Sequence, residues 1–183
     1  MPIAFLISFA VVAADLIIKY CVRCHMAPGE SISLLPGLRL TYVQNRGMAF
    51  GWLDDHRWVF LVLSALAILA LIGFIAFRKG YMRTVYVGMA LALGGGIGNM
   101  IDRLALGYVI DYIDFYPIPF WKWVFNLADA AICVGIAVLC VYLLFLEKKA
   151  KAAGKKVLFD EQSPKKDEQS PKKDEKTDGN ADV

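Results

Sequence analysis

The chain has 183 residues, of which 58% are hydrophobic and 20% are charged, and its formal net charge is +3. Soluble domains average about 45–50% apolar and about 25% charged residues, so this composition argues against an ordinary soluble domain. The positive charge does not indicate nucleic-acid binding, because many of the basic residues lie beside long apolar segments, where membrane topology places them.

Four apolar segments have the length of a membrane span, which is roughly 20 residues for a helix. We predict transmembrane helices over residues 2–22, 57–77, 83–103 and 124–146. The first segment lacks the basic start of a secretory signal peptide, so we expect it to remain as a helix. The predicted fold class is therefore an all-α membrane protein with four transmembrane helices.

The connections between these helices differ in character. Residues 31–52 contain short apolar runs separated by proline and glycine, which predicts a small strand-rich element in the first outer loop. The connection over residues 102–123 is rich in aromatic residues, as is typical of the boundary between lipid and water. Gly94 and Gly98 fall inside the third predicted helix, where their spacing favours close helix packing rather than a nucleotide-binding loop.

A repeated polar sequence follows the last predicted helix. The unit Asp-Glu-Gln-Ser-Pro-Lys-Lys begins at Asp160 and Asp167, and a diverging copy begins at Asp174. Such a proline-containing, nearly charge-balanced segment cannot bury a core. We therefore expect a four-helix membrane domain over residues 1–147 and a disordered charged tail over residues 148–183.

The basic residues predict the orientation in the membrane. Two groups follow the second and fourth helices: Arg78, Lys79 and Arg83, then Lys148, Lys149, Lys151, Lys155 and Lys156. Positive residues in short loops favour the cytoplasmic side. Both termini are then cytoplasmic, and the two long connections lie outside.

With this orientation, the polar residues of the helices fall into one outer layer. Ionisable side chains at membrane depth are costly and are usually functional. The layer contains Asp15 and Lys19 of the first helix, Asn99, Asp102 and Arg103 of the third, Asp111 and Asp114 of the following connection, and Asn126 and Asp129 of the fourth helix.

The spacing of these residues suggests roles for several of them. Asp15 and Lys19 are four residues apart with the acid first, which favours a structural ion pair. Asn99 and Arg103 share a helical face with Asp102, and their amide and guanidinium groups suit the binding of an extended peptide backbone.

Asp129 needs a partner inside the membrane layer, and either Asp111 or Asp114 could supply it. Two neighbouring carboxyl groups tend to share one proton. Such a pair can activate water as a base and protonate a leaving group as an acid. The alternative is that Asp129 only caps its helix or pairs with Arg103.

Two other functions also fit parts of the sequence. Cys21-Val22-Arg23-Cys24-His25 matches the pattern for covalent haem attachment, which suggests a membrane-anchored c-type cytochrome. No cytochrome-sized domain surrounds this motif, so a disulfide or two free thiols are the preferred interpretation. A small proton-linked transporter is a further alternative, although the inner halves of the predicted helices lack charges that could form a relay.

Five motifs in this order resemble the lipoprotein signal peptidase family, the bacterial signal peptidase II. They are Asp15-x-x-x-Lys19, Asn45 to Gly51, Gly98 to Arg103, Val109 to Phe115, and Phe125 to Asp129. The resemblance covers about residues 10–146 and implies an aspartic endopeptidase of the bacterial cytoplasmic membrane.

The family resemblance also implies a substrate and a set of site residues. The substrate is a prolipoprotein, cut before a cysteine that carries a diacylglyceryl group, and no metal or cofactor is implied. The catalytic pair corresponds to Asp111 and Asp129. Asn45 and Arg103 correspond to substrate-contacting positions, supported by Asn99 and Asn126, while Asp15, Lys19 and Asp102 have structural roles.

Overall fold

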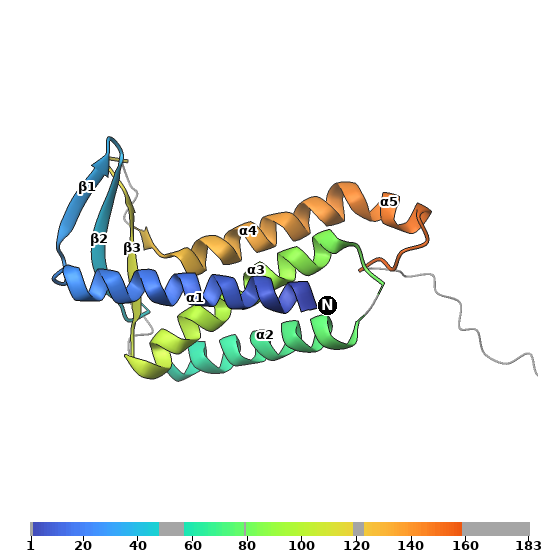
Figure 1. Ribbon diagram of the computed structural model, residues 1–183, viewed down its shortest axis with the longest axis horizontal. Coiled ribbons are helices and arrows are strands. Elements are labelled where there is room, and N and C mark those ends of the chain that lie inside the picture. Colours follow the sequence, from blue (N-terminus) through green and yellow to red (C-terminus); the bar gives the residue numbers. More distant parts are fainter. Residues whose placement is uncertain (1, 48–56, 79, 119–122, 159–183) are drawn as a thin grey trace, which may run out of the picture.

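The computed structural model describes residues 2–47, 57–78, 80–118 and 123–158. Its long helices lie side by side, with a small β-sheet at one end and the C-terminal helical segment at the other (Figure 1). The N-terminus lies toward the end that carries the C-terminal segment (Figure 1). The predicted loop residues 48–52 fall outside the described residues.

The helices are α1 (Pro2–His25), α2 (Arg57–Phe77), α3 (Arg83–Ala105) and α4 (Leu127–Val141). A π-helical turn, η1 (Tyr142–Leu146), joins α4 to a short α5 (Glu147–Ala152). α3 occupies the centre of the bundle and packs against α1, α2 and α4. These helices lie close to the predicted ranges because their apolar runs are long and are bounded by polar residues.

Three of the described helices are long and apolar enough to cross a membrane, namely Pro2–His25, Arg83–Ala105 and Leu127–Ala152. The apolar part of α2, Leu61–Phe77, is shorter. A mostly helical fold with three long apolar helices is therefore confirmed, whereas the fourth span stays a prediction.

Two boundaries of the predicted fourth helix are wrong. The helix begins at Leu127 rather than residue 124, because Val124–Phe125 forms a strand and the Asn126 side chain caps the first turn. At its other end, helical structure continues through η1 and α5 to Ala152. The first residues of the predicted disordered tail are thus helical, and residues 159–183 lie outside the described part of the chain.

The sheet contains four antiparallel strands in the order β1 (Ser31–Leu35), β2 (Leu38–Asn45), β3 (Val109–Phe115) and β4 (Val124–Phe125). Strands in the first outer loop were predicted. The sheet also takes strands from the second connection, which were not predicted. β3 is almost entirely buried, so its sequence lacks the apolar–polar alternation of a strand with one wet face.

Glycines of α3 allow the helices to approach closely, as the spacing of Gly94 and Gly98 predicts. A Cβ atom at Gly94 would lie 2.8 Å from the carbonyl oxygen of Ser8 on α1. A Cβ atom at Gly98 would lie 2.6 Å from a carboxylate oxygen of Asp15. Larger residues would push α1 away, and the polar groups of α1 and α3 would separate.

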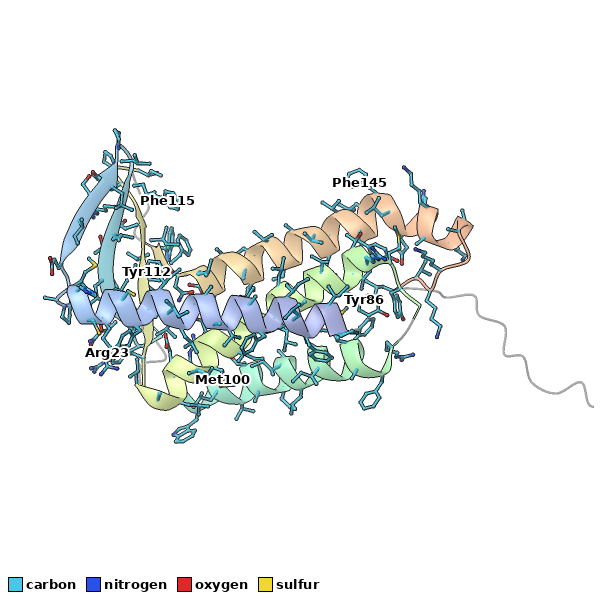
Figure 2. All side chains as sticks on the ribbon, in the orientation of Figure 1. Arg23, Tyr86, Met100, Tyr112, Phe115 and Phe145 are labelled. Carbon is cyan, nitrogen blue, oxygen red and sulfur yellow. The ribbon has the colours of Figure 1, made fainter. Side chains whose placement is uncertain are left out.

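An apolar cluster joins the C-terminal end of α1 to the sheet. Val22 and Met26 of α1 pack with Tyr42 of β2 and with Ile110 and Tyr112 of β3. Tyr112 lies between the sheet and the helices (Figure 2). This cluster holds the sheet over the helix ends, so that residues from α1, α3, β3 and α4 converge there.

Candidate active site

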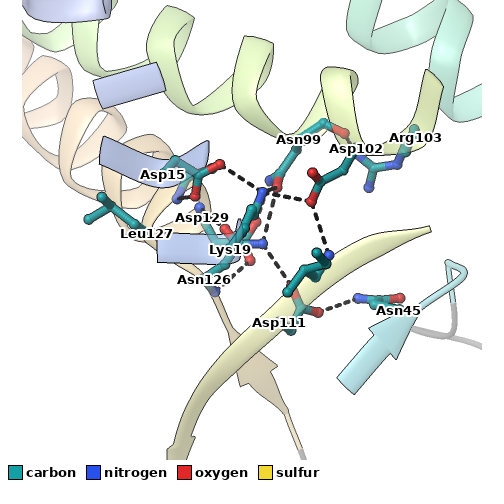
Figure 3. A network of polar contacts seen from close by, with 12 residues as sticks. Asp15, Lys19, Asn45, Asn99, Asp102, Arg103, Asp111, Asn126, Leu127 and Asp129 are labelled. Atoms are coloured by element: carbon teal, nitrogen blue, oxygen red, sulfur yellow. Dashed lines mark hydrogen bonds and ion pairs between the residues drawn. The ribbon is translucent and has the colours of Figure 1, made fainter. Parts of the chain in front are cut away.

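The polar residues of the predicted outer layer gather where the helices meet the sheet (Figure 3). Most of them are nearly inaccessible to solvent, with exposed fractions of 5% or less for Asp15, Lys19, Asn99, Asp102, Asp111 and Asn126. Buried polar groups of this kind require hydrogen-bond partners. The contacts that satisfy them define the geometry of the site.

Asp111 lies on β3 and receives two amide hydrogen bonds. The Nδ2 of Asn126 donates to Oδ1 of Asp111 over 2.7 Å, and the Nδ2 of Asn45 donates to Oδ2 over 2.8 Å. Asn45 comes from β2, where it stands beside Val109 in the register of the two strands. Asp111 is therefore held from two sides, by the start of α4 and by the neighbouring strand.

Asp129 lies in the first turn of α4. Its Oδ1 accepts a hydrogen bond of 2.7 Å from Nδ2 of Asn99, and its Oδ2 accepts one of 3.2 Å from the backbone N–H of Asn126. The backbone N–H of Asp129 donates in turn to Oδ1 of Asn126 over 2.8 Å. Asn126 and Asp129 thus form a capping box, and the same Asn126 side chain also bonds to Asp111.

Lys19 fixes the orientation of the side-chain amides of Asn99 and Asn126. Its Nζ lies 2.9 Å from Oδ1 of Asn99 and can only donate, so this atom must be the amide oxygen. The Nδ2 of Asn99 then points to Asp129, while Oδ1 also accepts from Asn126 over 3.1 Å. Through these bonds, Asn99 and Asn126 connect the carboxyl groups of Asp111 and Asp129.

The Lys19 ammonium is also the centre of a buried ion cluster. It lies 2.7 Å from Oδ2 of Asp15 and 3.0 Å from Oδ2 of Asp102. Asp15 accepts the backbone N–H of Ala128 in α4 over 2.9 Å, and Asp102 accepts the backbone N–H of Ile110 in β3 over 3.0 Å. The expected Asp15–Lys19 ion pair is present, and its cluster ties α1 and α3 to the two elements that carry Asp111 and Asp129.

Asp114, the second candidate partner of Asp129, has a different environment. Its Oδ2 contacts Nε of Arg39 over 2.6 Å and Oγ1 of Thr41 over 2.8 Å. Asp111 and Asp114 are three positions apart on one strand, so their side chains leave opposite faces of the sheet. The structure therefore joins Asp111, and not Asp114, to the hydrogen-bond network that contains Asp129.

Arg103 is half-buried at the edge of this network. Its Nη1 donates to the backbone oxygen of Asn99 over 3.3 Å. The expected role of Arg103 in binding substrate stays a prediction, as does that of Asn45.

The surroundings of Asp111 favour its protonated form. Burial raises the pKa of Asp111 to about 7, and the nearby charge of Asp129 adds to this rise. The hydrogen bonds from Asn45 and Asn126 and the charge of Lys19 act in the opposite direction. A carboxyl group with this pKa can donate a proton near neutral pH, and the side chains of Asn126 and Asn99 link it to the carboxyl group of Asp129.

Tyr112 is a site residue that the sequence analysis missed. Its hydroxyl oxygen accepts the backbone N–H of Leu127 over 3.2 Å, and burial raises the pKa of Tyr112 to about 12. In the sequence it is one of the aromatic residues of the connection 102–123, whose composition is typical of the boundary between lipid and water. Only the pairing of β3 with the sheet brings its hydroxyl to the start of α4.

Comparison with known proteins identifies the family. The sequence model of the family described as signal peptidase (SPase) II matches residues 7–145. The chain belongs to the signal peptidase II family. Its relatives include the lipoprotein signal peptidase of Clostridioides difficile (strain 630), which is 37% identical over 147 residues, or 80% of this chain and 97% of the relative. That of Halothermothrix orenii is 40% identical over 146 residues, or 79% and 97% of the two chains.

Solved structures agree with the sequence relatives. A bacterial membrane enzyme solved by the in meso method at 2.3 Å has a TM-score of 0.73 and 28% identity, and the match covers 87% of this chain and 96% of that one. A second such structure, at 1.9 Å, has the same TM-score of 0.73 and 29% identity, with 79% and 94% covered. This signal peptidase II family member is thus an integral membrane peptidase.

Proposed function

We propose that this chain is an aspartic membrane endopeptidase that removes signal peptides from prolipoproteins, cutting before the diacylglyceryl-modified cysteine. The observation that carries the aspartic mechanism is the hydrogen-bond network in which Asn126 contacts both Asp111 and Asp129. Curated relatives that align over nearly their whole length are named lipoprotein signal peptidases, which supports the substrate class.

Asp111 and Asp129 divide the acid and base roles in the proposed reaction. Asp111, with a pKa raised to about 7 by burial, is the partner that holds the proton. Asp129, whose negative charge adds to the rise in the pKa of Asp111, is the ionised partner and draws a proton from the attacking water. The water oxygen then bonds to the scissile carbonyl carbon, and Asp111 hydrogen-bonds the developing oxyanion.

Collapse of this intermediate breaks the carbon–nitrogen bond. The leaving amine takes a proton from the aspartate pair, and the other product is the carboxyl terminus of the signal peptide. Asn45 and Arg103 are proposed to bind the substrate backbone, because each lies at the edge of the network with an amide or guanidinium donor. This scheme uses no cofactor or metal ion.

The proposed placement is the bacterial cytoplasmic membrane, with α2 as a fourth span and both termini in the cytoplasm. The site then lies near the outer face, at the end of the bundle that carries the sheet (Figure 1). A substrate anchored by its signal helix and acyl chains can present its scissile bond there while the chains stay in lipid. Residues 1–147 form the membrane peptidase domain in this proposal, followed by a charged tail.

The two alternatives from the sequence are not favoured. A proton-linked transporter needs a relay of ionisable groups across the bilayer. In the described helices, the buried ionisable residues Asp15, Lys19 and Asp102 lie together at the end of the bundle beside the sheet. In the cytochrome interpretation the haem needs an enclosing pocket, but Cys21 and Cys24 are exposed.

The test is cleavage of a purified diacylglyceryl-modified prolipoprotein by the full chain in detergent micelles. Asp111→Asn and Asp129→Asn should each lower kcat by about a thousandfold or more, since general acid–base catalysis contributes about 10²–10⁴ in rate. Equal thermal unfolding midpoints would show that both variants fold. Full cleavage by either folded variant would exclude the aspartic mechanism, and failure of the wild type to release a signal peptide would exclude the substrate.

A further inference from the structure

The chain folds back on itself after α5, at the end of the molecule opposite the active site (Figure 1). Gly154 has φ +66° and reverses the chain, a conformation that suits glycine. The backbone N–H of Lys155 then bonds to the Ala150 oxygen over 3.0 Å, and that of Lys156 bonds to the Gly80 oxygen over 3.2 Å. The segment after α5 is therefore docked on the α2–α3 connection.

Apolar contacts hold this docked segment in place. Ala150 and Val157 are 1% and 7% exposed and belong to the same core cluster as Ile75 and Val85 of α2 and α3. The side-chain stem of Lys156 lies over Gly80, where an added Cβ would meet its Cγ and Cδ at 3.4 Å. The segment thus has a defined position beside the helix ends.

Docking brings two groups of cations to one surface. We call it the basic end surface, and it comprises the exposed residues Arg78, Arg83, Lys148, Lys149, Lys155 and Lys156. Glu147 is the only acidic residue in the sequence of the two contributing segments, 78–83 and 147–158. The contact between Lys156 and Gly80 places cations of one segment next to those of the other, so that their fields add.

The basic end surface adjoins large exposed apolar side chains. Phe77, one residue before Arg78, is 84% exposed, and Leu144 and Phe145, shortly before Lys148, are 73% and 67% exposed. Phe145 points away from the bundle (Figure 2). In a membrane protein such side chains face the acyl chains of the lipids. The cations of the basic end surface then lie at the boundary between the acyl chains and the headgroups.

We propose that the basic end surface binds the headgroups of anionic phospholipids, while the acyl chains of the same lipids contact Phe77, Leu144 and Phe145. The neighbouring apolar side chains favour a lipid over a soluble anion, because a lipid alone supplies both an anionic group and an apolar chain. The interaction is separate from the proposed peptidase site. Its assignment to the cytoplasmic leaflet rests on the proposed topology.

The test is native mass spectrometry of the full chain after exposure to equal amounts of phosphatidylglycerol and phosphatidylcholine with the same acyl chains. The wild type should retain phosphatidylglycerol in preference to phosphatidylcholine. Lys155→Gln/Lys156→Gln and Arg78→Gln/Arg83→Gln should each weaken that preference, by roughly fivefold for each cation removed. Thermal unfolding midpoints and precursor cleavage should stay near the wild-type values.

The matched control is Lys165→Gln/Lys166→Gln, which removes an adjacent lysine pair from the repeat tail. This variant should keep the wild-type lipid preference. Equal retention of both lipids by the wild type would overturn the proposal, as would an equal loss of preference in the tail control. Because lipid retention is measured without substrate, its outcome is independent of whether the chain cleaves prolipoproteins.

Discussion

Asn126 and Asp129 cap the first turn of α4 reciprocally, each accepting a backbone N–H from the other. In most helices such a box only satisfies free N–H groups. Here the remaining Nδ2 donor of Asn126 bonds to Asp111 over 2.7 Å and to Asn99 over 3.1 Å. The helix cap is therefore also the link between the two proposed catalytic carboxyl groups.

Substitutions of Asn126 should separate its capping role from its role in the site. Asn126→Ser keeps an oxygen that can accept the Asp129 N–H but lacks the amide donor. Its thermal unfolding midpoint should stay close to that of the wild type, because serine caps helices well. Its kcat should fall by about five- to a hundredfold, since the lost amide donor leaves a buried oxygen of Asp111 unsatisfied, which costs about 1–3 kcal/mol.

Asn126→Ala is the matched comparison, since it loses both the cap and the donor. It should show the same loss of kcat and an added loss of about 1 kcal/mol in the free energy of unfolding. If Asn126→Ser cleaved the precursor at the wild-type rate, Asn126 would act as a helix cap alone.

Asp114→Asn should show that Asp114 does not share the proposed catalytic role of Asp111, the other carboxyl group of β3. Asp114 bonds to Arg39 and Thr41, away from the network of Asp111 and Asp129. The variant should retain cleavage within a few-fold of the wild type and lose about 1 kcal/mol of stability or less, as partly exposed ion pairs do. A loss of kcat as large as that of Asp111→Asn would show that the two carboxyl groups act together.

The pH dependence of cleavage should report the protonation of Asp111. Its pKa is raised to about 7, so the proposed acid form is present below that pH and is lost as the pH rises through it. The kcat/KM profile should therefore fall on its alkaline side near that value. Asn45→Ala removes an N–H donor that lowers the pKa of Asp111, so the alkaline limb should move to higher pH.

The position of this limb matters more than the height of the profile, because Asn45 is also proposed to bind substrate. Asp114→Asn is a suitable control, since Asp114 has no hydrogen bond to the Asp111 side chain among the contacts of the described residues, and its limb should stay in place. If the alkaline limb of Asn45→Ala stayed at the wild-type pH or moved to lower pH, the assignment of the acid role to Asp111 would be contradicted.

The helices of this protein are predictable from sequence because their signal is local. Runs of apolar residues define α1 to α4 to within a few residues. The start of α4 was placed too early because Val124–Phe125 is apolar like the helix but pairs with β3. The end was placed too early because a π-helical turn and a lysine-rich helix continue the same element.

The site is less predictable because it depends on contacts distant in the sequence. The orientation of the helices predicts a common depth for Asp15, Asn99 and Asp129, but not which side chains touch. From the residues alone, Asp111 and Asp114 are equal candidates for the partner of Asp129. Only the resemblance of the surrounding motif to that of the signal peptidase II family distinguishes them. If Val109–Phe115 had been recognised as a strand, the three-residue spacing would have placed them on opposite faces. Burial on both faces concealed that strand.

The close packing of α3 and α4 should be essential for the site, and two neighbouring glycines allow a matched test. A Cβ atom at Gly95 would overlap the carbonyl oxygen of Ala128, whereas one at Gly96 would lie 3.5 Å from the Ile68 side chain, an ordinary contact. Gly95→Ala should therefore lower the free energy of unfolding by about 1–3 kcal/mol and reduce kcat, because it moves Asn99 away from Asp129. Gly96→Ala should fold and cleave like the wild type. Thermal unfolding and precursor cleavage measure both effects, and equal behaviour of the two variants would show that this contact does not position the carboxyl groups.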